Sequence, residues 1–284
     1  FGGTELTDMI GLKALGAVGF TDDGVPIKDT AIVMEAMKMA KALDVPLSFH
    51  EEDPALIGSF GVNQGPVSTA VGVEGAPAVA EDVLVARDCA LALSTGASID
   101  IQHISSATSV AIVRAMKALG KNIHAEATPQ HFSLTEEAVL AKGTLAKVNP
   151  PIRTEEDRQA IIHGLMDDTI DFIATDHAPH SGEEKARDMK SAPSGMIGLE
   201  TALALGITHL VKPGYLSLSH FLEKLTTNPA NLYHLDAGYV AVGGKADLVI
   251  FDENETWTVG EHFKSKASNS PFIGETLQGK VKFT

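Results

Sequence analysis

The stretch Ile173-Ala174-Thr175-Asp176-His177-Ala178-Pro179-His180 places an acid and two histidines directly after an apolar run. That run, from Ile170 to Ala174, has the length and composition of a buried strand. An acid at the C-terminal end of a strand can bind a metal ion and accept a proton from a metal-activated water. Taken alone, however, the stretch fits a polar turn with a solvent-facing Asp and His better than a metal site.

Three further apolar runs end in the same way, and together they favour the metal site. They are segments 17–24 (AVGFTDDG), 45–50 (VPLSFH) and 98–103 (SIDIQH), each closed by an acid or a histidine. In a parallel barrel the C-terminal ends of all strands meet at one face, so these residues should converge. Carboxylate and imidazole groups suit zinc or a similar first-row ion, and the single cysteine, Cys89, cannot supply a thiolate cage. The candidate metal ligands are therefore Asp23, His50, His103 and Asp176.

Strand and helix patterns alternate along most of the chain, as they do in proteins built from βα units. Predicted strands end at Asp23, His50, His103, Glu126 or Ala127, and Asp176. Helices are predicted over residues 29–43, 80–94, 106–118, from Thr154 onward and over 199–211. Residues 57–77 form a long loop, rich in Gly, Pro and Val, on the predicted catalytic face. A closed barrel of this kind has eight strands, so we expect three more upstream of Phe1.

The sequence changes character from Asp236 onward, where short strands and turns replace the βα pattern. Segments 238–244 (GYVAVGG) and 246–252 (ADLVIFD) are predicted to be strands of a small β domain, with partner strands upstream. We therefore divide the chain into a barrel part, residues 1–235, and a β-domain part, residues 236–284.

Composition narrows the classes of partner. The formal net charge of −15 argues against binding to nucleic acid or to an anionic membrane. A single cysteine excludes an internal disulfide and favours a reducing compartment. No apolar run approaches 18 residues and no signal-peptide pattern is present, so a soluble cytoplasmic protein is expected.

Five motifs are specific enough to indicate a family: residues 20–24 (FTDDG), 102–105 (QHIS), 147–153 (KVNPPIR), 175–180 (TDHAPH) and 195–201 (GMIGLET). With them, and over essentially its whole length, the chain resembles the dihydroorotases of the amidohydrolase superfamily. The terminal segment 244–249 (GKADLV) is similar to the superfamily's returning β-sandwich segment.

The resemblance implies a (β/α)₈ TIM-type barrel, here strands four to eight, with a small β-sandwich domain. It implies two zinc ions per site, held by Asp23, His50 and His103 on strands four to six and by Asp176 on strand eight. Asp176 would also be the general acid and base. The substrate contacts implied by the resemblance are Asn149, His180, Pro193 and Gly195.

The implied reaction is the reversible interconversion of N-carbamoyl-L-aspartate and L-dihydroorotate in pyrimidine biosynthesis. The implied partners are this small-molecule substrate, a second copy in a homodimer, and an aspartate transcarbamoylase. The His-x-His pair of the first strand is not in this sequence, nor are the family's upstream substrate-binding Arg and Asn. We therefore expect roughly 130 to 150 further residues on the N-terminal side, from the missing strand count. Gln130 stands where many relatives have a histidine, so His131 is interpreted as structural.

Two alternative functions remain. A hydantoinase, dihydropyrimidinase or allantoinase would use the same barrel, but relatives of those classes usually have a modified lysine on the fourth strand, where this chain has Asp23. A catalytically silent homologue, acting as a structural partner, would be expected to have lost metal ligands, and the four predicted here are intact.

Overall fold

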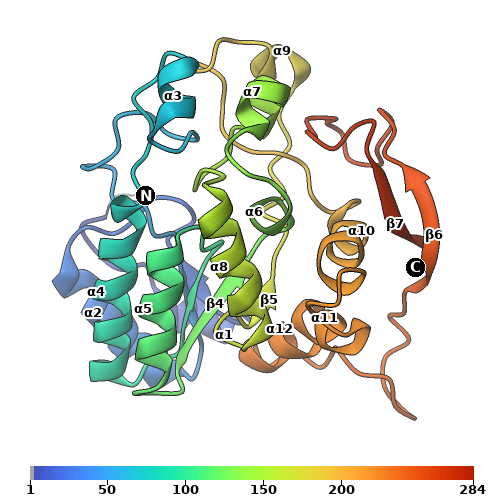
Figure 1. Cartoon of the computed structure of the whole chain (residues 1–284). Helices are drawn as coiled ribbons and strands as arrows, with labels where there is room; N and C mark the ends of the chain where they lie inside the picture. Colours follow the sequence, from blue (N-terminus) through green and yellow to red (C-terminus); the bar gives the residue numbers. More distant parts are fainter. Residues whose placement is uncertain (1–2) are drawn as a thin grey trace.

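A sheet of five parallel strands forms the centre of the molecule (Figure 1). The computed structural model describes residues 3–284. Neighbouring strands follow chain order, and the register pairs Leu47 with Ile99 and Ile99 with Ile123. The strands are β1 (Phe20–Thr21), β2 (Leu47–Phe49), β3 (Ile99–Ile101), β4 (Ile123–Ala127) and β5 (Phe172–Ile173). All five predicted strands are therefore confirmed, in the predicted order.

Helices link successive strands, and local capping signals set where they begin. The predicted helices correspond to α2 (Thr30–Leu43), α4 (Val79–Thr95), α5 (Ala107–Lys117) and α8 (Glu155–Met166), and α1 (Met9–Ala14) precedes β1. The Asp29 carboxylate accepts the backbone N–H of Ala31 at 2.8 Å, which satisfies one free donor of the first turn of α2. Thr154 and Asp157 form a reciprocal capping box at the start of α8, the helix predicted from Thr154 onward.

The core lies between the sheet and these helices. Both faces of β2 and β3 are buried, as expected for parallel strands covered by helices. The largest fully buried apolar side chains include Phe132, Phe221, Phe272, Met37, Ile99, Ile101 and Ile123. Phe272 comes from the segment between the last two strands, so the C-terminal region contributes to this same core.

Short helices gather at the end of the sheet to which the strands point (Figure 1). They are α3 (Pro66–Ala70), α6 (Pro129–Ser133), α7 (Ala138–Lys142), a 3₁₀ turn (Gly143–Ala146) and α9 (Gly182–Lys185). The long loop over residues 57–77 therefore contains α3, and Asn63 pairs with Ala76 across its base. It is more ordered than its composition predicts, because backbone bonds tie its two ends together.

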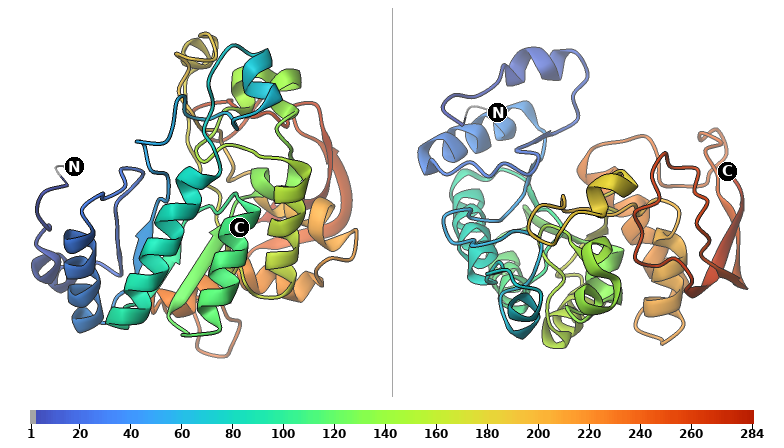
Figure 2. Two further views of the ribbon diagram at one scale, coloured as in Figure 1. Left: turned by 60° about the vertical axis from the view of Figure 1, so that its left-hand side comes forward. Right: turned by 90° about the horizontal axis from the view of Figure 1, so that it is seen from above.

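The C-terminal region departs most from the sequence prediction. It contains α10 (Ala202–Gly206), a π-helical turn (Ile207–Val211), α11 (Leu218–Leu225), α12 (Thr227–Leu232), β6 (Ile250–Thr258) and β7 (Thr276–Phe283). Predicted helix 199–211 begins only at Ala202, because Gly198 to Thr201 form a turn. β6 and β7 pair as an antiparallel hairpin on the side of the molecule opposite α1 and α2 (Figure 2).

Among residues 3–284, residues 238–244 form no strand, and the strand predicted over 246–252 is formed only from Ile250 onward, as part of β6. Within residues 3–284 no strand pairs with 238–244, and Val240 and Val242 are 87% and 109% exposed. A strand needs a hydrogen-bonded neighbour, so apolar alternation alone does not produce one. The boundary at residue 235/236 stays a prediction. In the described part of the chain, no helix combines the length and apolarity needed to cross a membrane.

Replacing Gly206 with alanine is expected to destabilise the fold by about 1–3 kcal/mol through overpacking. A Cβ atom at this helical position would lie 2.1 Å from the Phe221 ring. In an exposed helix the same change would be stabilising. Gly182→Ala in α9 is the matched control, since its Cβ would meet nothing within 4 Å. Urea unfolding of both variants measures the difference, and equal effects would contradict this packing argument.

Candidate active site

Two histidines from adjacent strands face each other at the C-terminal ends of β2 and β3. Nδ1 of His50 lies 3.0 Å from Nε2 of His103, and the ring centroids are 4.7 Å apart. Both residues are only 7% exposed. The structure therefore brings together two of the four predicted metal ligands, with one nitrogen of each ring directed at the other.

A buried carboxylate fixes the orientation of the first histidine. Oε2 of Glu52 lies 2.9 Å from Nε2 of His50, and Glu52 is 1% exposed. A carboxylate only accepts hydrogen bonds, so Nε2 of His50 carries the proton and Nδ1 presents a lone pair toward His103. This is how a carboxylate commonly orients a metal-binding imidazole. The sequence analysis did not assign Glu52 a role, although its position two residues after a strand-end histidine was the available signal.

The surroundings shift the pKa values of the two imidazoles in opposite directions. Burial disfavours the charged form of His50, but the hydrogen bond and charge of Glu52, together with Asp22 and Asp176, raise its pKa overall. Burial, followed by the neighbouring His50 and His131, lowers the pKa of His103 well below its usual value. His103 is therefore neutral at physiological pH, which is the protonation state needed to bind a metal ion.

Three of the four predicted ligands have backbone conformations that non-glycine residues rarely adopt. The φ angles are +48° at Asp23, +36° at His103 and +47° at Asp176. Each such residue costs on the order of 1–3 kcal/mol and persists only where the surrounding structure imposes it. Because all three lie at strand ends on the same face, the strain is concentrated where the chemistry is predicted.

Two further carboxyl groups hold the backbone of the histidines. Asp22 accepts the N–H of His50 at 2.9 Å, and Glu126 accepts the N–H of His103 at 3.3 Å. Burial raises the pKa of Asp22 to about 6 and that of Glu126 to about 7. The buried Asp22 and Glu52 and the half-buried Glu126 thus support the histidine pair, and the sequence analysis did not assign them this role.

Neither Asp23 nor Asp176 forms a hydrogen bond with the histidine pair in the described structure. Asp176 is partly buried, burial raises its pKa, and the charge of His50 opposes that shift. Asp23 is exposed and makes no hydrogen bond with either histidine. Within residues 3–284 no group of three or more His, Cys, Asp or Glu side chains is arranged to hold a metal ion. The structure therefore supplies a histidine pair after β2 and β3, with Asp23 after β1 and Asp176 after β5.

The predicted substrate-contacting residues occupy three loops beside the strand ends. Oδ1 of Asn149 is buried without a hydrogen-bond partner, and the peptide bond between Asn149 and Pro150 is cis. Nε2 of His180 donates to the carbonyl of Ser194 at 2.9 Å. Gly195 has φ +130°, and a Cβ there would lie 2.6 Å from Ala178. His180 and Gly195 are therefore in contact, and only glycine fits at that position.

His131 is fully engaged within the fold. Its Nδ1 lies 2.7 Å from Oγ1 of Thr128, and its Nε2 lies 3.0 Å from the carbonyl of Pro150. Both ring nitrogens are thereby occupied, which agrees with the structural role expected for this residue.

Two buried lysines shape the loop that carries Pro193 and Gly195. Nζ of Lys185 donates to the carbonyls of Pro193 and Gly195, both at 3.0 Å. Nζ of Lys147 donates to the carbonyl of Ala192 at 2.6 Å. Burial, with the nearby Lys147 charge, lowers the pKa of Lys185 to about 8. The irregular loop is therefore held largely by ammonium groups donating to its carbonyls.

A buried polar cluster ties the 57–77 loop to the segment that follows Asn149. The Arg153 side chain, which is 1% exposed, donates to Oδ1 of Asn63 at 2.9 Å and to Oγ of Ser105 at 2.8 Å. Its guanidinium also lies 3.6 Å from Glu81. This cluster fixes the loop against the candidate site.

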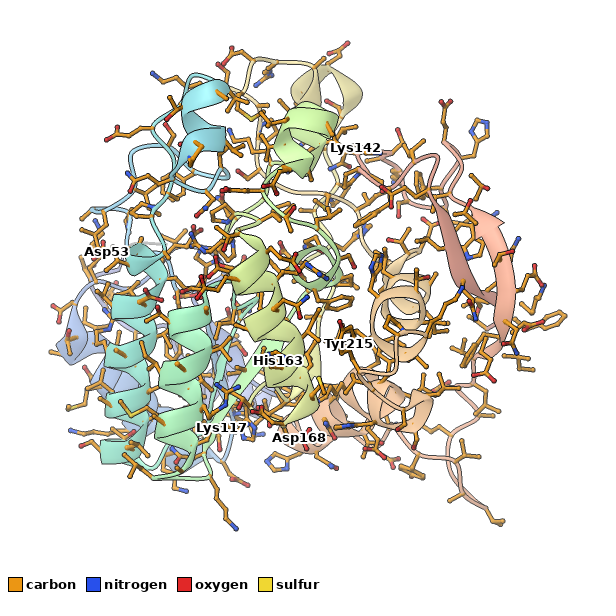
Figure 3. The ribbon with its side chains drawn as sticks, in the orientation of Figure 1. Asp53, Lys117, Lys142, His163, Asp168 and Tyr215 are labelled. Carbon is orange, nitrogen blue, oxygen red and sulfur yellow. The ribbon has the colours of Figure 1, made fainter. Side chains whose placement is uncertain are left out.

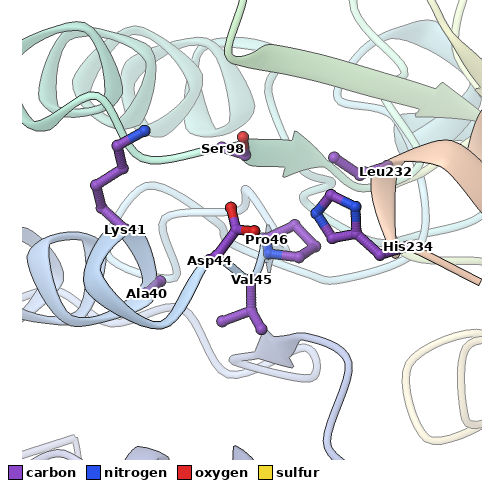
Figure 4. A pocket seen from close by; sticks show the side chains of 8 residues that line it. All are labelled: Ala40, Lys41, Asp44, Val45, Pro46, Ser98, Leu232 and His234. Atoms are coloured by element: carbon purple, nitrogen blue, oxygen red, sulfur yellow. The ribbon is translucent and has the colours of Figure 1, made fainter.

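Two pockets lie at the opposite end of the strands. One of about 30 Å³ is lined by the end of α2, Ser98, Leu232 and His234 (Figure 4). A second of about 540 Å³ includes His124, Asp168 and Asp171. At this end Lys117, the last residue of α5, donates to the carbonyl of Asp168, which lies in the turn after α8, at 2.8 Å (Figure 3). These contacts belong to the face that stabilises the sheet, away from the histidine pair.

Comparison with known proteins assigns the family. A family model described as dihydro-orotase-like matches residues 2–109. The chain is 60% identical over 284 residues to a dihydroorotase of Clostridioides difficile (strain 630) and covers 67% of that protein. The chain belongs to the dihydroorotase family. A family member from Lactococcus lactis subsp. lactis (strain IL1403) is 54% identical over 284 residues, again with 67% of its length covered.

Solved structures confirm the predicted fold class of this dihydroorotase-family chain. The L-hydantoinase (dihydropyrimidinase) of Arthrobacter aurescens matches with a TM-score of 0.85 at 25% identity, covering 95% of this chain. A dihydropyrimidinase from Brevibacillus agri NCHU1002 matches with a TM-score of 0.83 at 22% identity, covering 98% of this chain. The chain spans 64% and 65% of those two proteins. The five parallel strands are part of a (β/α)₈ TIM-type barrel of the amidohydrolase superfamily.

The buried Lys185 ammonium is expected to make stability rise with pH above about 8. Its folded pKa lies below its unfolded value of 10.5, so the unfolded chain binds more protons between these two pH values. Over this pH range the free energy of unfolding of the wild-type protein should rise by on the order of 3 kcal/mol more than that of Lys185→Met, which lacks the titrating group. Denaturant unfolding at pH 7, 8.5 and 10 measures this, with exposed Lys212→Met as the control. A wild-type–variant gap that stays constant with pH would refute the assignment.

Proposed function

We propose that the protein is a zinc-dependent dihydroorotase that reversibly interconverts N-carbamoyl-L-aspartate and L-dihydroorotate in pyrimidine biosynthesis. The observation that carries the proposal is the buried His50–His103 pair at adjacent strand ends, in a chain that is 60% identical to a dihydroorotase over its whole length. Asp176, after β5, supplies a carboxyl group at the same face.

The donor set suits zinc. His103 is neutral, and in the neutral form of His50 the hydrogen bond from Nε2 to Glu52 leaves Nδ1 free to bind the metal. We assign Asp23, His50, His103 and Asp176 as this chain's ligands to a centre of two zinc ions. When bound, zinc lowers the pKa of a coordinated water toward about 7 and polarises the carbonyl to be attacked.

Asp176 is the proposed general acid and base. In the hydrolytic direction it accepts a proton from the attacking water and returns it to the departing ring nitrogen. Burial raises the pKa of this carboxyl, which favours its taking up a proton during the reaction. Ring closure of N-carbamoyl-L-aspartate uses the same group in the reverse order.

The substrate is proposed to lie against Asn149, His180, Pro193 and Gly195. The unpartnered Oδ1 of Asn149 can accept a ring N–H of dihydroorotate, because a buried acceptor without a partner favours a ligand donor. Lys147 and Lys185 place positive charge behind the loop that carries Pro193 and Gly195. That local charge favours an anionic substrate in a chain with a formal net charge of −15.

A second candidate is a hydantoinase-type cyclic amidohydrolase. The match to the Arthrobacter aurescens L-hydantoinase favours it, since 95% of this chain superposes on that enzyme. Asp23 at the end of β1 favours dihydroorotase, because the resemblance places a modified lysine at this position in the hydantoinases. Cytoplasmic location, a homodimer and association with aspartate transcarbamoylase are further proposals that follow from the family resemblance.

Asp176→Asn is expected to lower kcat for dihydroorotate hydrolysis by about 10²–10⁴-fold, because the amide cannot shuttle the proton. Zinc-loaded protein expressed from its complete gene is assayed spectrophotometrically. Exposed Asp247→Asn is the matched control and should behave as wild type. Wild-type turnover of hydantoin or dihydrouracil, without turnover of dihydroorotate, would favour the second candidate instead.

Removing the Glu52 carboxylate is expected to weaken zinc binding by about 10–100-fold, because His50 loses the partner that fixes its proton. Glu52→Ala tests this, and Glu52→Gln should retain more affinity because its amide oxygen can still accept from Nε2. Zinc affinity is measured by chelator competition, with exposed Glu253→Ala as control. Unchanged affinity in both Glu52 variants would rule out the orienting role.

A further inference from the structure

One asparagine near the C-terminus joins two of the three loops that carry the proposed substrate contacts, the one with His180 and the one with Gly195. Asn269 lies between β6 and β7 and is 3% exposed. Its Oδ1 accepts the backbone N–H of His180 at 3.1 Å. Its Nδ2 donates to the carbonyls of Ala178 at 3.0 Å and Gly195 at 3.1 Å. The side-chain amide therefore uses both its donor and its acceptor groups on the two loops.

The two loops already run side by side, and Asn269 sets their alignment. Ala178 donates to the carbonyl of Met196 at 2.9 Å, and His177 pairs with Met196 as an isolated parallel bridge. The backbone carbonyl of Asn269 accepts the N–H of Ile197 at 3.2 Å. Four hydrogen bonds from one residue thus span the loops just where neither belongs to a strand or helix.

Asn269 is itself rigidly held. Phe272, three residues later, is 1% exposed within the core. Earlier in the segment, the Glu200 carboxylate accepts the backbone N–H groups of Lys264 at 2.8 Å and Ser265 at 2.9 Å. An amide anchored on both sides can impose a geometry on its partners, which a mobile side chain could not do.

We propose that Asn269 is a positioning residue for substrate binding, which fixes His180 and Gly195 relative to each other. The inference rests on the proposed function, because it assigns a purpose to the contact between these loops. The carbonyl of Gly195 accepts from both Asn269 and Lys185, so the loop is fixed from two directions. A C-terminal segment thereby becomes part of the binding machinery for a cyclic anionic substrate.

The experiment compares KM and kcat for dihydroorotate in wild type, Asn269→Ala, Asn269→Asp and Asn254→Ala, using zinc-loaded protein from the complete gene. Asn269→Ala should raise KM by about ten- to a hundredfold, because misplaced binding groups weaken substrate orientation. Zinc content should stay unchanged. Asn269→Asp keeps the acceptor for His180 but turns an oxygen toward two carbonyls, so its KM should rise at least as much. Asn254 is exposed on β6, and its variant should match wild type.

Any other outcome either overturns the inference or requires that it be tested with another substrate. A KM within twofold of wild type in a folded Asn269 variant overturns it, as does failure of both variants to fold, which would show a structural role. If wild type hydrolyses hydantoin or dihydrouracil but not dihydroorotate, the proposed function fails and the KM shift is measured on that substrate. If wild type hydrolyses none of these cyclic amides, both the function and the inference fail.

Discussion

The register between β2 and β3 is the constraint on which the candidate site depends. Phe49 pairs with Ile101, so the chain leaves both strands at the same level and His50 can meet His103. A slip of one residue would turn every side chain of a strand to its other face. The flanking strands complete the arrangement, because Asp22 after β1 and Glu126 on β4 accept the backbone N–H groups of the two histidines. Sheet pairing thus sets both the ligand geometry and its supports.

The site concentrates features that lower stability, and the core has to offset them. Positive φ angles at Asp23, His103 and Asp176 each cost on the order of 1–3 kcal/mol. The buried acids and lysines add desolvation costs, seen in the raised pKa of Asp22 and the lowered pKa of Lys185. A sheet buried on both faces supplies the compensating apolar area. This combination is expected where a rigid scaffold holds groups poised for chemistry.

The sequence predicted what depends on local pattern and missed what depends on distant contacts. The five parallel strands, the start of α8 at Thr154 and the strand-end positions of the two histidines agree with the prediction, because period, capping residues and chain order are local signals. Asn269 could not be found in this way, because its partner His180 is 89 residues away. Residues 238–244 form no strand among residues 3–284, because a strand forms only with a neighbour and none of the described strands pairs with them. Glu52 lay within reach of local reasoning, but its role appears only once the His50 ring is oriented.

Nearby buried charges determine the electrostatic potential around the substrate loops, although the chain as a whole is acidic. Exposed charges more than about 8–10 Å away are largely screened at physiological salt, so most of the −15 formal charge acts weakly at the site. Buried ammonium groups are screened much less, and Lys147 and Lys185 lie directly behind the loop that carries Pro193 and Gly195. Both donate to backbone carbonyls, so their charge is not neutralised by a directly bonded carboxylate. Asn269 contributes no charge to this region, and it therefore fixes the loops without changing the field that an anionic substrate would meet.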